Sequence, residues 1–110
     1  HSWYDYFMHL IAFVTCPNKK EAELIAGDLV RQKIAACVNI LAGVKSVYRW
    51  KGRVESSKEL LLVIKTKKSK LAKLIKKVKS LHSYDVPEII AVAIAGGSKD
   101  YLEWINDSVR

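Results

Sequence analysis

The sequence contains few cysteines and few prolines. Its 110 residues include only two of each, and the cysteines are Cys16 and Cys37. Half of the residues are hydrophobic, which is enough for an apolar core, so the pattern does not indicate a disulfide-stabilised fold. We expect both thiols to be free, as is typical of proteins in a reducing compartment.

Long hydrophobic runs are also absent. The longest runs, at 60–64 and 89–95, are far shorter than the roughly 20 residues that cross a bilayer. The first ten residues lack the basic start and cleavage site of a secretory signal. We therefore expect no membrane insertion and a cytoplasmic location, or an organelle if a targeting segment precedes the sequence. We interpret residues 1–7 as a tag remnant or a flexible segment, and residues 8–110 as a single domain.

Acidic residues are missing from one segment of the chain. The formal net charge is +8, and residues 65–79 contain eight lysines and no acidic residue. A basic surface of this kind can attract nucleic acid or another polyanion. These lysines fall between apolar residues at helical spacing, which is typical of the solvent-facing side of an amphipathic helix. We therefore expect no nucleic-acid partner.

The hydrophobic pattern predicts four strands and three helices. Asn18, Ser69 and Ser98 are the expected helix caps. Lys51 and Gly52 predict a tight hairpin turn, and Gly43 predicts a bend in the strand before it. Short apolar or alternating runs predict strands, and apolar steps of three and four residues predict helices. The strands are expected at 10–15, 37–50, 54–66 and 86–95, and the helices at 19–33, 69–81 and after Ser98.

The order of these elements predicts an α+β fold. A βαββαβ order with both helices on one face of an antiparallel sheet is the ferredoxin-like arrangement, here with an extra C-terminal helix. The aliphatic run at 60–64 is expected at the centre of the sheet. No segment of the chain is left to cover four apolar residues of the hairpin strands, so we expect an obligate homo-oligomer. These four residues are Val44, Val47, Tyr48 and Trp50.

Six stretches of the sequence together resemble one family. They are TCPN at 15–18, IAACVN at 34–39, SVYRWKG at 46–52, IKT at 64–66, HSYDVPE at 82–88 and YLEW at 101–104. In order and spacing they match the CutA family of divalent-cation tolerance proteins over about residues 8–109. The sequence departs from the family pattern at Ser83, where proline is usual, and at Asp85, where glutamate is more common.

The resemblance implies a homotrimer of ferredoxin-like protomers whose sheets face inward. It also implies a role in tolerance to copper and other divalent cations, with copper or another divalent cation bound but not required for folding. The family's metal ligands are cysteines on the first and second strands and a loop histidine. This pattern points to Cys37 and His82, but the first-strand position is Val14 here, and Cys16 lies two residues away.

The candidate metal ligands are therefore Cys37, His82 and Cys16. Thiols and imidazoles are donors that copper and zinc accept. The sequence has no Cys-x-x-Cys, no His-x-His and no acidic cluster, so no pair has the spacing of a closed high-affinity site. Each residue also has an interpretation without metal. Cys37 could be a small buried residue of a strand, His82 could form a hydrogen bond within its loop, and Cys16 could be an unreactive thiol at a strand end. Both interpretations stay open.

A second set of candidate residues predicts a cleft between protomers. Its members are Tyr48, Trp50, Glu59, Lys65, Tyr84 and Glu88. The charged groups suit a small polar ligand, and the aromatic rings equally suit a packed interface. The alternative function is therefore a small-molecule sensor similar to the PII trimers, or a scaffold trimer that binds ligands or partner proteins in such clefts. No nucleophile is paired with a base, so we do not expect an enzyme.

Overall fold

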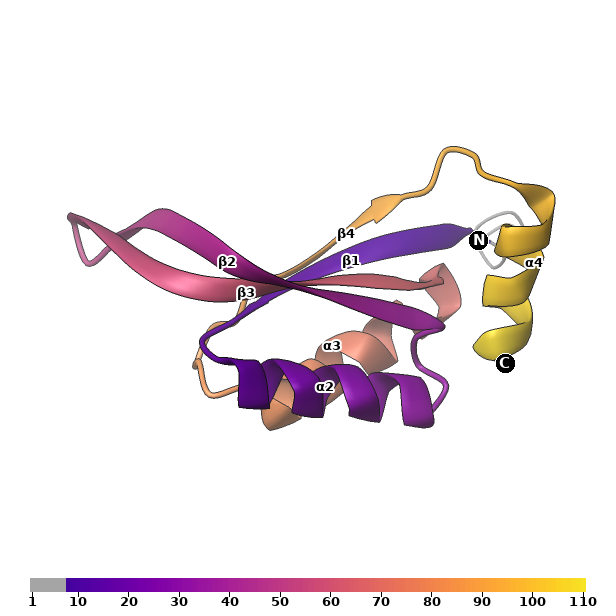
Figure 1. Ribbon diagram of the computed structural model, residues 1–110, viewed down its shortest axis with the longest axis horizontal. Coiled ribbons are helices and arrows are strands. Elements are labelled where there is room, and N and C mark those ends of the chain that lie inside the picture. The colour runs from indigo at the N-terminus through magenta and orange to yellow at the C-terminus, as the bar shows by residue number, and fades with distance from the viewer. Residues whose placement is uncertain (1–7) are drawn as a thin grey trace.

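The computed structural model describes residues 8–110 as a four-stranded antiparallel sheet with three α-helices (Figure 1). This arrangement confirms the predicted α+β ferredoxin-like fold with an extra C-terminal helix. The prediction made for residues 1–7 lies outside the described residues. The elements are β1 (His9–Cys16), α2 (Lys19–Arg31), β2 (Cys37–Trp50), β3 (Arg53–Lys67), the 3₁₀ helix η1 (Lys68–Lys70), α3 (Leu71–Leu81), β4 (Ile89–Ala93) and α4 (Lys99–Ser108).

The strands lie in the order β2-β3-β1-β4, and every neighbouring pair is antiparallel. Ala12 of β1 pairs with Ile64 on one side and with Ala91 on the other. The aliphatic run of β3 is therefore in an interior strand, as its composition predicted. Side chains alternate between the two faces along each strand, so this register decides which residues meet the helices.

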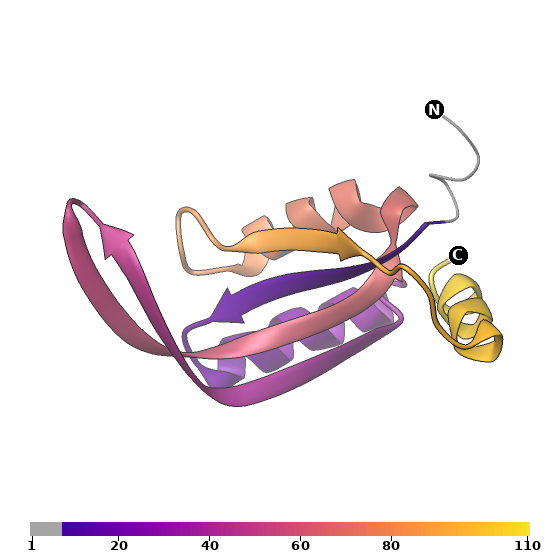
Figure 2. The same cartoon turned by 90° about the horizontal axis from the view of Figure 1, so that it is seen from above.

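The main core lies between the sheet and the helices α2 and α3, which cover the same face (Figure 2). The side chains of Ala12, Val14 and Cys16, at every second position of β1, are fully buried there. Helix α2 contributes Ile25 and Leu29, which are also fully buried. Each such large aliphatic side chain contributes roughly 1.5–3 kcal/mol. The end of β1 is therefore held firmly between the sheet and the helices.

The opposite face of the sheet is covered by no other described element along most of its length (Figure 1). Ile90 and Val92 of β4 are 56% and 49% exposed there, and Leu41 of β2 is 44% exposed. Helix α4 lies only at the end of the sheet, where the Leu102 carbonyl is 3.0 Å from His9 Nε2. The described residues thus leave an apolar sheet face open.

The long β2–β3 hairpin follows the predicted turn and bend. Lys51 and Gly52 both have positive φ, 51° and 77°, as a type I′ turn requires. The register shifts between Leu41 and Val44, and Gly43 between them has φ 77°. A bulge of this kind bends a strand, and the hairpin extends beyond the helices in Figure 1.

Two of the three predicted helix caps are confirmed. Asn18 accepts the Glu21 N–H through Oδ1 at 2.9 Å, and Ser98 accepts the Tyr101 N–H through Oγ at 3.2 Å. The prediction for Ser69 was wrong, because that residue lies inside η1 and α3 begins two residues later without a side-chain cap. None of the described helices is long and apolar enough to cross a bilayer.

Strand β4 is shorter than predicted at both ends, and its first paired residue is Ile89 rather than Val86. Continuing the register would place Glu88 opposite Thr15. The carbonyl oxygen of Thr15 instead accepts a hydrogen bond from His82, and Pro87 has no N–H to offer the next rung. Residues 82–88 are therefore a loop over the end of β1.

Candidate metal centre

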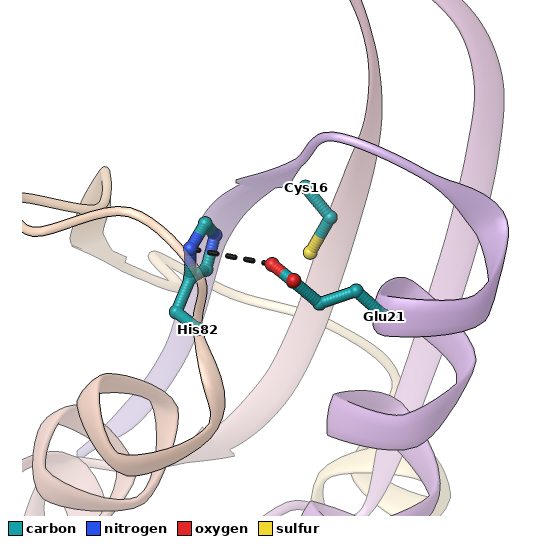
Figure 3. A group of neighbouring side chains, drawn as sticks. All are labelled: Cys16, Glu21 and His82. Atoms are coloured by element: carbon teal, nitrogen blue, oxygen red, sulfur yellow. Dashed lines mark ion pairs between the residues drawn. The ribbon is translucent and has the colours of Figure 1, made fainter.

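Cys16, Glu21 and His82 bring one thiol, one carboxylate and one imidazole together (Figure 3). One ligand atom of each lies within 4.8 Å of the ligand atoms of the other two. Cys16 is the last residue of β1, Glu21 is in the first turn of α2, and His82 directly follows α3. The site is formed where a strand, a helix N-terminus and a helix C-terminus meet.

The turn between β1 and α2 places Glu21. Asn18 caps α2, so Glu21 is the third residue of the helix, where a glutamate often bonds back to the capping residue. Its carboxylate instead lies 3.4 Å from His82 Nδ1 and accepts the Ser83 N–H at 3.3 Å. A carboxylate at this position is also favoured by the helix dipole. Glu21 thereby links α2 to the loop after α3.

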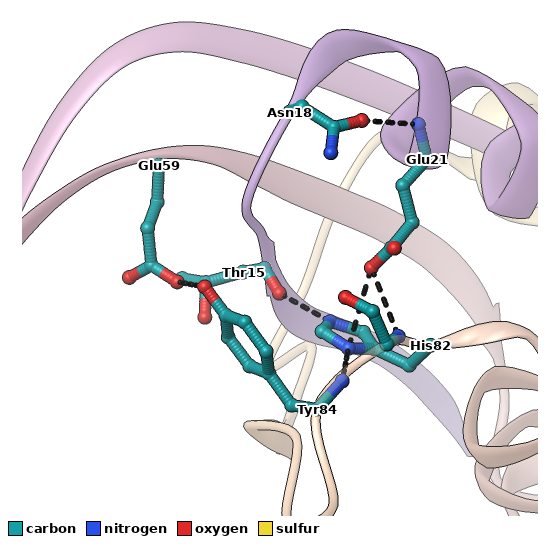
Figure 4. A network of polar contacts seen from close by, with 7 residues as sticks. Thr15, Asn18, Glu21, Glu59, His82 and Tyr84 are labelled. Atoms are coloured by element: carbon teal, nitrogen blue, oxygen red, sulfur yellow. Dashed lines mark hydrogen bonds and ion pairs between the residues drawn. The ribbon is translucent and has the colours of Figure 1, made fainter.

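The hydrogen bonds of His82 fix its orientation (Figure 4). Nε2 lies 2.7 Å from the Thr15 carbonyl oxygen, and the Tyr84 N–H points to Nδ1 at 3.1 Å. A carbonyl can only accept and an amide N–H can only donate, so the hydrogen is assigned to Nε2 and the lone pair to Nδ1. The side chain of His82 is fully buried. The Nδ1 lone pair is therefore directed at the Tyr84 N–H, with the Glu21 carboxylate 3.4 Å from the same nitrogen.

Cys16 is a buried thiol beside two carboxylates. Burial raises its pKa from 9.0 to about 12, and the negative charges of Glu21 and Glu59 add to the shift. The group is therefore a neutral thiol near neutral pH. A cation between Cys16 and Glu21 would reverse this balance, because a coordinating thiol loses its proton.

These three side chains fit a divalent metal ion. Sulfur, imidazole nitrogen and carboxylate oxygen are the donors that zinc and copper accept, and three protein ligands leave one position open. Metal-binding histidines usually donate their other ring N–H to a carbonyl or carboxylate. His82 does so through Nε2 toward Thr15, which leaves Nδ1 as the candidate ligand atom.

Comparison with known proteins assigns the family. The family model described as "CutA1 divalent ion tolerance protein" matches residues 10–108. The chain belongs to the CutA1 family. It is 48% identical over 101 residues to "Protein CutA, chloroplastic" of Arabidopsis thaliana, covering 92% of this chain but only 56% of that protein. It is 45% identical over 101 residues to "Divalent-cation tolerance protein CutA" of Thermus thermophilus, covering 92% of this chain and 98% of that protein.

Solved CutA1 structures share the fold. CutA1 from Oryza sativa superposes with a TM-score of 0.91 at 48% identity, over 94% of each chain. The Thermus thermophilus protein superposes with a TM-score of 0.92 at 44% identity, over 94% of this chain and all of that one. The resemblance inferred from the six sequence stretches is therefore confirmed.

Cys37, the cysteine that the CutA pattern places on the second strand, lies apart from this cluster. It pairs with Lys65 of β3, whereas Cys16 pairs with Leu60. Five residues separate those partners, which is about 17 Å along the strand. Cys37 also lies on the open face of the sheet, near Tyr101 of α4, whose pKa it helps to raise. Within one chain, Cys37 cannot join His82 at one ion.

The six residues predicted to line a cleft lie in different parts of the single chain. Tyr84 donates its hydroxyl to Glu59 Oε2 at 2.8 Å, and Tyr48 lies near enough to affect the Tyr84 pKa. Trp50 is at the hairpin turn, and Glu88 is exposed just before β4. Lys65, which hydrogen-bonds Asn39, is at the far end of β3. Of the six residues, Glu59 and Tyr84 are the two that a hydrogen bond joins within one chain.

Glu21 is the site residue that sequence reasoning missed. The signal available was its position three residues after the cap Asn18 and five after Cys16. That spacing is usual for a capping box, in which the carboxylate stays on its own helix. The direction of the Glu21 side chain depends on His82, which is 61 residues further along the chain.

Proposed function

We propose that this chain is a divalent-cation-binding protein that acts in metal tolerance, and that the bound ion is copper or zinc. The observation that carries the proposal is the meeting of Cys16, Glu21 and His82 Nδ1 within 4.8 Å. The printed name of the Thermus thermophilus relative, a divalent-cation tolerance protein, agrees with this chemistry. Of the three ligands expected from sequence, Cys16 and His82 are retained, and Glu21 takes the place of Cys37.

The proposed binding step is an exchange of protons for a cation. Cys16 gives up its thiol proton, and the Glu21 carboxylate supplies negative charge. His82 offers Nδ1, while its Nε2–H stays hydrogen-bonded to the Thr15 carbonyl oxygen. Because the thiol is held neutral by its surroundings, the free site contains one negative charge, that of Glu21, rather than two. Metal binding of this kind releases protons and strengthens as pH rises.

We also propose that the chain functions as a homotrimer. The support is the open apolar sheet face, together with the exposed apolar hairpin residues Val47 and Val54, which are 65% and 70% exposed. An exposed apolar sheet face and exposed apolar residues on a protruding hairpin are usually covered by another chain. Trimers are what the CutA resemblance implies, and in a cyclic trimer each chain covers one surface of its neighbour with a different surface of its own.

The test is a titration of the reduced protein with Zn(II) and with Cu(I), each against a competing chelator in the absence of oxygen. The variants are Cys16→Ser, Glu21→Gln and His82→Gln. In His82→Gln, the glutamine amide can still donate to the Thr15 carbonyl but has no nitrogen donor at the position of Nδ1. This variant therefore distinguishes loss of a metal ligand from loss of a structural hydrogen bond. Cys37→Ser is the matched thiol control.

The expected result is saturation at one ion per chain. Binding should weaken in Cys16→Ser and His82→Gln by more than the roughly 10- to 100-fold that loss of an outer hydrogen bond causes. Cys37→Ser should bind as the unchanged protein does. Binding that depends on Cys37, or on none of these residues, would overturn the assignment and favour the alternative of a ligand site between chains.

A further inference from the structure

The lone pair that His82 offers to a metal is already in use. The Tyr84 N–H donates to Nδ1 at 3.1 Å, while Nε2 donates to Thr15. Nδ1 has a single lone pair, so it cannot accept the amide and bind a cation at the same time. A cation at His82 must therefore displace the Tyr84 backbone.

The same loop also contacts the second ligand. The Ser83 N–H donates to Glu21 Oε2 at 3.3 Å. A carboxylate has several lone pairs and can accept an amide while it binds a metal. Glu21 therefore does not force the loop to move, and the conflict is confined to Tyr84 and His82.

The side chain of Tyr84 resists this displacement. Its ring packs on the His82 imidazole with 4.7 Å between ring centroids. Its hydroxyl donates to Glu59 Oε2 at 2.8 Å, and Glu59 is only 7% exposed. The Tyr84 amide and hydroxyl are thus held at two ends, on His82 and on β3 (Figure 4).

We infer that metal binding at Cys16, Glu21 and His82 and the observed position of Tyr84 exclude each other, so that Tyr84 and Glu59 regulate the site. This inference rests on the proposed function. In the free protein, Tyr84 closes the loop over Nδ1. When His82 binds a cation, the Tyr84 amide leaves, the hydroxyl loses Glu59, and residues 83–86 adopt another position.

Displacement of this loop changes the molecular surface when a cation binds. Val86 is 82% exposed and Tyr84 is 36% exposed, so movement of residues 83–86 changes a partly apolar surface beside the hairpin. A ligand that selects one of two loop positions shifts their populations by its difference in affinity. The loop therefore reports whether a cation is bound.

The test compares Zn(II) affinity in the unchanged protein, Tyr84→Phe and Tyr101→Phe. Tyr84→Phe removes the anchor on Glu59 and keeps the ring. A hydrogen bond that must break on binding is worth about 2- to 10-fold in affinity, so this variant should bind more tightly by that factor. Tyr101→Phe, at the other end of the sheet, should leave the affinity unchanged. Hydrogen exchange gives the second measurement, because the Tyr84 amide should exchange faster with Zn(II) bound.

The outcomes separate this inference from the proposed function. If Zn(II) binds through Cys16 and His82 but Tyr84→Phe binds equally or more weakly, and the Tyr84 amide stays protected, Tyr84 supports the site and the inference is wrong. If the unchanged protein binds no Zn(II) and no Cu(I), or binds them without Cys16 and His82, the proposed function and the inference fail together.

Discussion

The imidazole of His82 donates from Nε2 to the carbonyl oxygen of Thr15 at 2.7 Å. This bond joins the end of α3 to the end of β1. It fixes the imidazole tautomer, since a carbonyl requires the hydrogen on Nε2. It also occupies the carbonyl that would otherwise continue the ladder between β1 and β4. One contact thus orients a proposed metal ligand and ends a strand.

The first prediction concerns the stability that this contact provides. His82→Ala leaves the Thr15 carbonyl, in a residue only 8% exposed, without its partner. An unsatisfied buried group and a cavity should lower the free energy of unfolding by about 2–4 kcal/mol. His82→Gln should recover part of this loss, because its amide can reach Thr15. Guanidinium unfolding at one fixed chain concentration measures both variants. Equal stability of the two would show that the hydrogen bond contributes little.

The second prediction concerns stability at alkaline pH. Folding raises the pKa of Cys16 from 9.0 to about 12, so above pH 9 the unfolded chain loses this proton while the folded chain keeps it. The unfolded state then binds fewer protons, and the free energy of unfolding falls as pH rises, by up to about 1.4 kcal/mol per pH unit between 9 and 12.

Cys16→Ser tests this linkage. Unfolding free energies of both proteins are measured between pH 8.5 and 10.5, and the unchanged protein should show the steeper decline. Tyr84 and Tyr101, whose phenol pKa values are also raised in the folded state, are present in both proteins and cancel in the difference. Parallel curves would mean that the Cys16 thiol ionises alike in the folded and unfolded chains.

The third prediction concerns the end of α2. The Ile34 N–H bonds the Leu29 carbonyl at 2.9 Å and the Lys33 N–H bonds the Val30 carbonyl at 3.1 Å, which is a Schellman motif. Its left-handed residue is Lys33, with φ 59°, where glycine is usual. Lys33→Gly should raise the free energy of unfolding by about 1 kcal/mol. Lys33→Ala keeps the Cβ strain while it removes the charge, so a similar gain in both variants would contradict this explanation.

Sequence reasoning located the elements because their signals are local. Periodicity separated strands from helices, and Lys51-Gly52, Gly43, Asn18 and Ser98 act through their own backbone and near neighbours. The error at α2 is local: the helix ends at Arg31 rather than at residue 33 because Lys33 reverses the chain, and lysine is not a residue type that signals a left-handed conformation. The error at β4 arose because a distant residue decides, since the strand is shortened by the bond between His82 and Thr15.

The candidate site was only partly predictable for the same reason. Cys16 and His82 could be named from their chemistry, but their meeting depends on how α3 packs against the end of β1. Glu21 has the sequence position of a capping residue, and its role at the site depends on His82. Cys37 matched the family pattern, yet the sheet register places it on the other face. Candidate ligands can be named from residue type alone, but which of them lie together depends on the tertiary structure.

The last prediction concerns association through the open sheet face. Ile90 of β4 and Leu24 of α2 are similarly exposed in the single chain, at 56% and 51%. They lie on opposite sides of the molecule, Ile90 on the uncovered face and Leu24 on the outer surface of a helix. A lysine is tolerated at either position in the isolated chain, but within an interface it would be a buried charge without a partner. Ile90→Lys should therefore dissociate the proposed trimer, and Leu24→Lys should not, as measured by light scattering of both purified variants. A trimer that survives Ile90→Lys would place the interface elsewhere, and a monomeric unchanged protein would reject the assembly itself.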